Sequence, residues 1–153
     1  MENLEKSAYG WVKARPEEVD IQNKYYCQTR DAFQTRLDKM VNTLLESGNV
    51  SEENAYIISA MAGEIGNNSF DHNLGNWPDI AGIFFGCDFS EEKVKIVLAD
   101  RGRGGLATLK KVKPNLKNDA DALWTAFTEK ISGRAPENRG NGLKFVRENV
   151  RDK

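Results

Sequence analysis

The sequence has almost no net charge and very little cysteine. Its 22 basic and 23 acidic side chains give a formal charge of −1, and neither sign forms a block along the chain. Nucleic-acid-binding surfaces usually show as a cluster or an excess of basic residues, so the composition gives no indication of one. Cys27 and Cys87 lie in a helix-like and a strand-like run. This is typical of two reduced thiols rather than of a disulfide framework or a zinc site.

Long apolar runs are also missing. The longest, residues 80–87 and 94–99, fall far short of the roughly 20 residues that span a bilayer. The N-terminus does not follow the pattern of a secretory signal, so we expect a cytoplasmic protein with no membrane-embedded part. At 153 residues the chain has the length of one domain and can bury a core without disulfides or structural metal.

The first half of the chain predicts two amphipathic helices. From residue 24 to residue 47, apolar side chains recur at spacings of three and four, and Gly48 follows as a C-cap. Ser51 caps a second helix that ends near Asn73 and packs antiparallel to the first. Residues 1–20 mix charges with aromatic side chains. There, a strand over residues 8–12, a short helix and a disordered leader all remain open.

The second half predicts a β-hairpin and three shorter helices. The two strands cover residues 80–89 and 93–100, and the alternation of the second gives it one apolar face that helices should cover. Its apolar positions are Val94, Ile96 and Leu98. The helices are predicted at residues 106–112, 120–131 and 143–150. The apolar side chains of the second of these are Leu123, Trp124 and Phe127.

Three polar residues stand out on the helix that ends near Asn73. Glu64, Asn68 and His72 recur every four residues and share one helical face. The same side of the helix carries Ile57, Met61 and Ile65, so the pattern predicts a dry face. Polar groups carried into a core need partners, which indicates a ligand, an ion or water. A half-exposed, capped helix end is the structural alternative.

Two glycine-rich stretches follow in a fixed order. Asp100, Gly102 and Gly104 form Asp-x-Gly-x-Gly at the end of the second strand, and Arg139-Gly-Asn-Gly-Leu143 opens the last helix. Together with Glu64-x-x-x-Asn68-x-x-x-His72, this ordered set resembles the N, G1 and G2 boxes of the GHKL ATPase superfamily. The greatest similarity is to the anti-sigma-factor serine kinases and related small histidine-kinase-like ATPases. The resemblance covers residues 24–150, roughly.

The resemblance implies an α+β fold of the Bergerat type, with an N-terminal segment at residues 1–20 and an ATP-binding domain at residues 21–153. The expected architecture is a two-layer α/β sandwich in which helices lie on one face of a mixed, mostly antiparallel sheet. Residues 132–141 correspond to the ATP lid. Family members continue into further strands after the last helix, whereas this sequence stops at Lys153. The sheet is therefore expected to lack its last strands, or to have its edge filled by the N-terminal segment or by a partner.

The resemblance also assigns roles, with ATP and Mg²⁺ as cofactors. Asp100 would accept a hydrogen bond from the adenine amine, Asn68 would bind Mg²⁺, and Glu64 would act as general base. His72 would touch the nucleotide edge or satisfy the helix end. Gly102 and Gly104 permit close approach of the backbone. Phosphate contacts would come from the last motif and the lid, namely from Arg134, Arg139, Gly140, Gly142 and Leu143.

Several functions are compatible with these roles. The first is a serine or threonine protein kinase, or an ATP-dependent switch, that acts on a small regulatory protein. The alternatives are an ATPase that closes or forms a homodimer on nucleotide, a binding module without turnover, and the truncated catalytic domain of a sensor kinase. His72 is the single histidine, so the chain cannot supply a separate phosphoacceptor box of its own.

Overall fold

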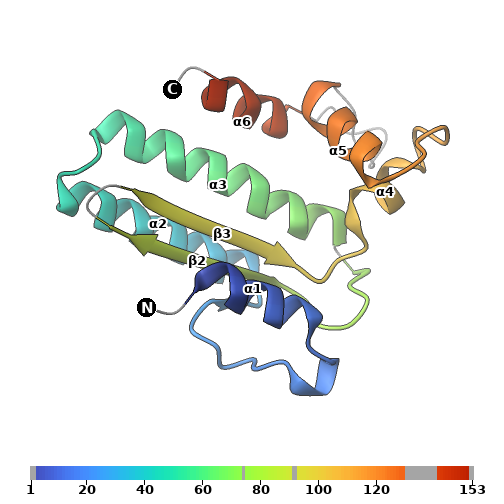
Figure 1. The fold of residues 1–153 in the computed structure, drawn as a ribbon, viewed down its shortest axis with the longest axis horizontal. Coiled ribbons are helices and arrows are strands. Elements are labelled where there is room, and N and C mark those ends of the chain that lie inside the picture. Colours follow the sequence, from blue (N-terminus) through green and yellow to red (C-terminus); the bar gives the residue numbers. More distant parts are fainter. Residues whose placement is uncertain (1–2, 74, 91–92, 130–140, 152–153) are drawn as a thin grey trace.

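The computed structural model describes residues 3–73, 75–90, 93–129 and 141–151. In this part of the chain, six α-helices and one short 3₁₀ helix surround a three-stranded antiparallel open sheet (Figure 1). The helices are α1 (Leu4–Lys13), α2 (Arg30–Ser47), α3 (Glu52–Asn73), α4 (Gly104–Leu109), α5 (Asp119–Thr128) and α6 (Gly142–Arg151), and the 3₁₀ helix is Pro16–Glu18. The strands are β1 (Tyr26–Cys27), β2 (Ile83–Phe89) and β3 (Val94–Asp100). The α+β class predicted from the sequence is confirmed.

The sheet has the order β1-β2-β3, and both strand pairs are antiparallel. The expectation of a mixed sheet is therefore not met among the described strands. The predicted hairpin forms, and its register places Asp100 opposite Ile83 and Val94 opposite Phe89. This register brings the end of β3, where the Asp-x-Gly-x-Gly motif begins, to the start of β2.

One face of the sheet is covered by α2 and α3, as predicted. Thr29 caps α2 by accepting the amide of Ala32 at 3.2 Å, and Gly48 ends it with a φ of 67°. The predicted start of this helix at residue 24 is wrong, because residues 26–27 pair with β2 instead. The core between helices and sheet is apolar throughout, and its fully buried members are Cys27, Phe33, Leu37, Leu44, Ala55 and Ile83.

The contact between α2 and α3 depends on a glycine. A Cβ atom added to Gly66 would lie 2.2 Å from Cζ of Phe33, whose side chain has no exposed surface. The Phe33 ring also meets Phe85 of β2 edge-on, with ring centroids 5.1 Å apart. Gly66 therefore allows one aromatic ring to pack against α3 and the sheet at the same time.

The other face of the sheet is covered by α1, which corrects the expectation of helices on one face alone. Residues 8–12 belong to this helix and form neither a strand nor a leader. Asn3 caps it by accepting the amide of Lys6 at 2.9 Å. The buried residues of α1, at spacings of four and three, pack in one cluster with Phe84 and Tyr26, and they are Leu4, Ala8 and Trp11. The sheet thus lies between two helical layers (Figure 1).

Helices α4 and α5 lie beyond the end of β3, and α6 runs back alongside α3 and packs against it (Figure 1). The helix predicted at residues 106–112 begins two residues earlier, at Gly104, and ends at Leu109. In α5 the predicted apolar face is wrong. Leu123 and Trp124 are 60% and 67% exposed, whereas Ala122 and Thr125 are buried. The guanidinium of Arg147 lies 5.6 Å from the Trp124 ring centroid and shields part of the ring.

Both thiols are free, as predicted. Burial raises the pKa of Cys27, and it raises the pKa of Cys87 to about 12. Neither thiol is therefore a reactive thiolate near neutral pH. Among the described helices, none combines the length and the apolar character needed to cross a bilayer.

Candidate functional site

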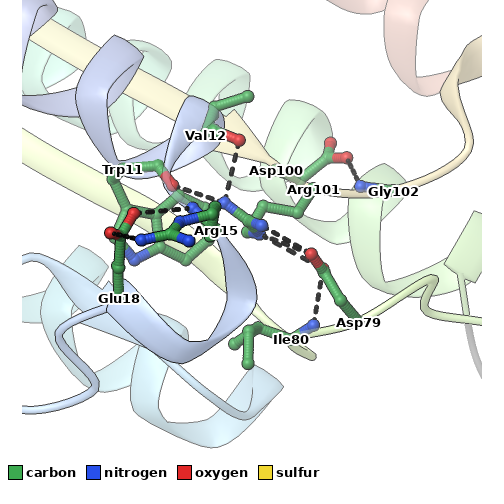
Figure 2. Close-up of polar contacts among 9 residues, drawn as sticks. All are labelled: Trp11, Val12, Arg15, Glu18, Asp79, Ile80, Asp100, Arg101 and Gly102. Carbon is green, nitrogen blue, oxygen red and sulfur yellow. Dashed lines mark hydrogen bonds and ion pairs between the residues drawn. The ribbon is translucent and has the colours of Figure 1, made fainter.

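The candidate site is centred on the carboxylate of Asp100, the last residue of β3. One carboxylate oxygen accepts the hydroxyl of Ser69 on α3 at 2.6 Å. The other accepts the backbone N–H of Gly102 at 2.7 Å, as Figure 2 shows. Because a carboxylate oxygen has two lone pairs, each oxygen of this half-buried group keeps capacity for a further donor. The carboxylate is thus oriented before any ligand arrives.

A buried asparagine holds the loop that follows. Asn73 is 5% exposed, donates its side-chain amide to the carbonyl of Ser69 at 2.8 Å, and accepts the backbone N–H of Arg103 at 3.2 Å. A Cβ atom on Gly102 would lie 2.2 Å from this amide nitrogen, so the close approach requires glycine. We call residues 100–104 the Asp100 loop. It is fixed to the end of α3 by Ser69 and Asn73.

The end of the Asp100 loop is open. Gly104 has a φ of 77°, a conformation that favours glycine, and it starts α4. A Cβ atom at Gly104 or at Gly105 would meet nothing within 4 Å. Gly104 and Gly105 are both exposed, and the ligand contact predicted for Gly104 stays a prediction. Gly102, in contrast, serves the packing of the loop against Asn73.

The predicted dry face of α3 is wrong. Its buried residues are Ala55, Ala62, Gly66, Phe70 and Asn73, whereas Glu64 is exposed and both Asn68 and His72 are half-buried. The reason is geometric, because residues four apart advance by about 40° around a helix. The stripe begins at Glu64, opposite the core, and turns toward the core at each step. Ile57, Met61 and Ile65 are half-buried beside it.

Glu64 nevertheless meets the last motif. A Cβ atom added to Gly142 would lie 1.9 Å from Oε2 of Glu64, so the carboxylate lies directly against the first residue of α6. The N-terminus of a helix carries partial positive charge and unpaired N–H groups, which favour an anion. A phosphate bound to the same N–H groups would lie beside Glu64. Leu143 is half-buried in the first turn of α6.

The other predicted phosphate contacts and most of the predicted lid lie outside the described residues. Arg134, Arg139 and Gly140 belong to this group. In the part of the chain that the structure describes, no group of three or more histidine, cysteine, aspartate or glutamate side chains is arranged to hold a metal ion. The predicted Mg²⁺ site did not depend on such a group, since Asn68 was to complete a shell of phosphate and water oxygens.

Sequence reasoning missed the two α3 residues that hold the Asp100 loop. Ser69 and Asn73 have the same four-residue spacing as Asn68 and His72, displaced by one position. On the helix this moves them about 100° toward the core side, where β3 ends. A search of α3 for polar residues next to its buried row would have found both.

Comparison of the chain with protein-family models, with curated proteins and with solved structures found no match. Two contacts of the candidate site join motifs that are distant in sequence. Ser69 joins α3 to Asp100, and Glu64 joins α3 to the start of α6.

Proposed function

We propose that this protein binds ATP with Mg²⁺ at the Asp100 loop, and that it acts as a serine or threonine kinase or an ATP-dependent switch on a small regulatory protein. The observation that carries the proposal is the carboxylate of Asp100. It is half-buried, oriented by Ser69 and by the Gly102 amide, and followed by open glycine backbone. A fixed acceptor in such a position can select a base by hydrogen bonding.

The chemistry of the carboxylate favours adenine. Adenine presents an exocyclic amine, which donates to a carboxylate, whereas guanine presents a carbonyl oxygen at the same position, which a carboxylate repels. A site built to accept a hydrogen bond rejects a ligand that lacks the donor much more strongly than an apolar pocket does. ATP and ADP should therefore bind in preference to GTP and GDP.

The position of Glu64 supports chemistry on the terminal phosphate. Its carboxylate lies at the first residue of α6, where phosphate oxygens would find N–H groups. A carboxylate beside a phosphate can take the proton of an attacking water or hydroxyl, which is the work of a general base. Asn68, one turn further along α3, offers a neutral amide oxygen suited to Mg²⁺. When bound, the ion would neutralise charge on the phosphates.

The proposal is tested by titration calorimetry of Mg-ATP and Mg-GTP with Asp100→Asn and with Asp88→Asn. Asp88 is also a half-buried aspartate of the sheet, but it lies toward the other end of the hairpin. Asp100→Asn should weaken ATP binding at least about tenfold, because a hydrogen bond to a charged group is worth roughly 1.5–3 kcal/mol. Asp88→Asn should bind like the wild type. Equal affinities of the wild type for ATP and GTP would contradict the adenine assignment.

The same preparations separate turnover from binding. Glu64→Gln removes the general base but keeps the size of the side chain, so ATP affinity should change little while phosphate release or transfer falls about 100-fold. Activity is followed as phosphate release and as label transfer to candidate partner proteins. A wild type that binds ATP tightly but shows neither activity with suitable partners supplied is a nucleotide-gated binding module, not a kinase.

A further inference from the structure

The arginine inside the Asp100 loop, Arg101, donates five side-chain hydrogen bonds. Arg101 has a side chain that is 7% exposed. Its Nε donates to both carboxylate oxygens of Asp79 at 3.1 Å, and its Nη2 donates to one of them at 2.5 Å. Its Nη1 donates to the backbone carbonyls of Trp11 and Val12 at 2.6 and 2.8 Å. Figure 2 shows these bonds converging on one guanidinium group.

Two of these bonds cap the C-terminal end of α1. Trp11 and Val12 belong to the last turn of α1, which ends at Lys13. Carbonyls in the last turn of a helix receive no hydrogen bond from an N–H group of the helix itself. A cation at this end also meets the negative end of the helix dipole. Arg101 therefore acts as a C-terminal cap for α1, although it comes from a segment about 90 residues away in the chain.

The neighbours of Arg101 face the opposite side of the sheet. Asp100 contacts Ser69 of α3, whereas Arg101 contacts α1. Adjacent residues of an extended chain point to opposite faces, so this alternation follows from the backbone. One short segment is thus fixed from both sides. Its conformation depends on α3 through Asp100 and on α1 through Arg101.

An ion pair between α1 and β3 is of a different kind. Glu5 and Lys95 form an ion pair at 3.0 Å near the start of α1, with side chains that are 54% and 38% exposed. Exposed pairs of this kind contribute little, because water and salt screen them. The buried Arg101 contacts are the ones that join α1 to the Asp100 loop, and the Glu5 pair offers a control at the far end of the same helix.

We propose that Arg101 is a positioning residue that couples the docking of α1 to the shape of the Asp100 loop, so that α1 and adenine nucleotide regulate one another. This inference rests on the proposed function. When α1 is docked, Arg101 holds the loop in the form in which the Asp100 carboxylate is aimed. Because coupling is reciprocal, bound nucleotide should favour the docked position of α1 by the same factor by which docking of α1 raises the affinity for nucleotide. A partner protein that displaced α1 would release nucleotide.

The test uses the full chain with Arg101→Lys, and with Glu5→Gln as control. Lysine keeps the charge but cannot reach Asp79 and two carbonyls together, since it lacks the planar fork of arginine. Circular dichroism and the melting temperature establish that each variant is folded. Hydrogen exchange without nucleotide then reports on the amides of Gly102 and Arg103. In Arg101→Lys these amides should exchange at least fivefold faster than in the wild type, and in Glu5→Gln they should be unchanged.

The second measurement adds Mg-ATP. In the wild type, nucleotide should slow exchange in α1, and in Arg101→Lys this response should be lost while ATP affinity falls about 5- to 50-fold. Glu5→Gln should keep both the response and the affinity. A residue that only added stability would not uncouple α1 from nucleotide. Comparison of the ATP dissociation constant with the protection of α1 in each variant therefore separates positioning from stability.

The outcomes separate the two proposals. Unchanged exchange at Gly102 and Arg103 in a folded Arg101→Lys variant overturns the coupling, whether or not ATP binds. If these amides exchange faster but the wild type does not bind ATP, the coupling between α1 and the Asp100 loop stands. The regulation by nucleotide is then overturned together with the proposed function. Tight binding of ATP without any change of exchange in wild-type α1 overturns the reciprocal regulation alone.

Discussion

The two faces of the sheet are stabilised in different ways. Toward α2 and α3 the core is apolar, and aromatic rings such as Phe33 and Phe85 fill the space without exposed surface or with very little. Hydrogen bonds on this side, from Ser69 and to Asn73, lie where β3 ends. Toward α1 the apolar cluster is smaller, and a buried charged group, Arg101, lies at its edge. Apolar contact has no preferred direction, whereas hydrogen bonds to a guanidinium fix both distance and angle. The face toward α2 and α3 carries the larger apolar core. On the face toward α1, the bonds of one buried arginine add a second support for the Asp100 loop, which Ser69 and Asn73 hold from α3.

Because of this difference, the two faces should lose stability through different kinds of substitution. A close-packed interior responds to added volume wherever it has no room to relax. A directional polar cluster responds to loss of charge or of a donor instead. Three substitutions, taken in order of expected effect, distinguish the two kinds of face.

Gly66→Ala should have the largest effect, a net loss of about 2 kcal/mol in the free energy of unfolding. The added Cβ would lie 2.2 Å from the buried Phe33 ring, and overpacking of this kind costs roughly 1–3 kcal/mol. Gly63→Ala on the same helix is the control. Its Cβ would lie at an ordinary 3.6 Å from Leu37, so the higher helix propensity of alanine should stabilise by about 0.5–1 kcal/mol. Urea unfolding of both variants provides the measurement, and equal stabilities would show that Phe33 moves freely.

Asp79→Asn should have an intermediate effect that depends on pH. Hydrogen bonds from Arg101 hold the pKa of Asp79 below its usual value of 3.8. The carboxylate therefore stabilises the fold fully above that value, and this stabilisation is lost as pH falls through the lower pKa of the folded state. At neutral pH the variant should be about 1–2 kcal/mol less stable, since Asp79 is partly exposed and Arg101 keeps its two carbonyl acceptors.

The measurement for Asp79→Asn is the difference in unfolding free energy from the wild type between pH 7 and pH 3. The gap should shrink steadily below pH 4. A gap that stays constant over this range would mean that the charge of Asp79 does not contribute to the fold. Other carboxylates titrate in both proteins alike, so they cancel in the difference.

Gly86→Ala should have the smallest effect, within about 1 kcal/mol of the wild type. Its Cβ would lie 2.5 Å from a Cδ atom of Leu4 on α1. This atom is the far end of a flexible side chain in the first turn of α1, so it can move where the Phe33 ring cannot. Alanine also loses less backbone entropy than glycine in a strand, which offsets part of the strain. A loss as large as that of Gly66→Ala, measured by the same urea unfolding, would mean that the α1 face is packed as tightly as the other.

The sequence predicts the apolar face well and the polar face poorly. Spacings of three and four predict the apolar side of α2, and alternation predicts that Ile96 and Leu98 of β3 face the core with α2 and α3. For α3 the helix was predicted but its buried side was wrong. The same reasoning cannot place α1, because its buried residues are few and one, Ala8, is small. A pattern of hydrophobicity also carries no information on which distant carbonyl will accept a hydrogen bond. For this reason the contacts of Arg101 with α1 and Asp79 could not be predicted from its position in a glycine-rich motif.

In the candidate site, too, some residues could be predicted from the sequence and others could not. Residue type and spacing suffice to predict a turn after Asp100, and the structure has that turn between β3 and α4. The nucleotide-binding role of Asp100 came from the resemblance and stays a prediction. The reason given for selecting Glu64, a dry helical face, is wrong because Glu64 is exposed. Its contact with Gly142 nevertheless brings the first and last motifs together. Ser69 and Asn73 became visible only with the helix and the strand in place.

The bonds from Arg101 to α1 have a consequence for how the sequence of this protein can diverge. Both acceptors are main-chain carbonyls, which every amino acid possesses. Substitutions at residues 11 and 12 would change the apolar packing but leave these acceptors in place as long as the last turn of α1 forms. Covariation between Arg101 and the residues it contacts in α1 should therefore be weak, whereas Arg101 and Asp79 should vary together. An alignment of distant homologues would therefore reveal the contact of Arg101 with Asp79 but not its contact with the main chain of α1.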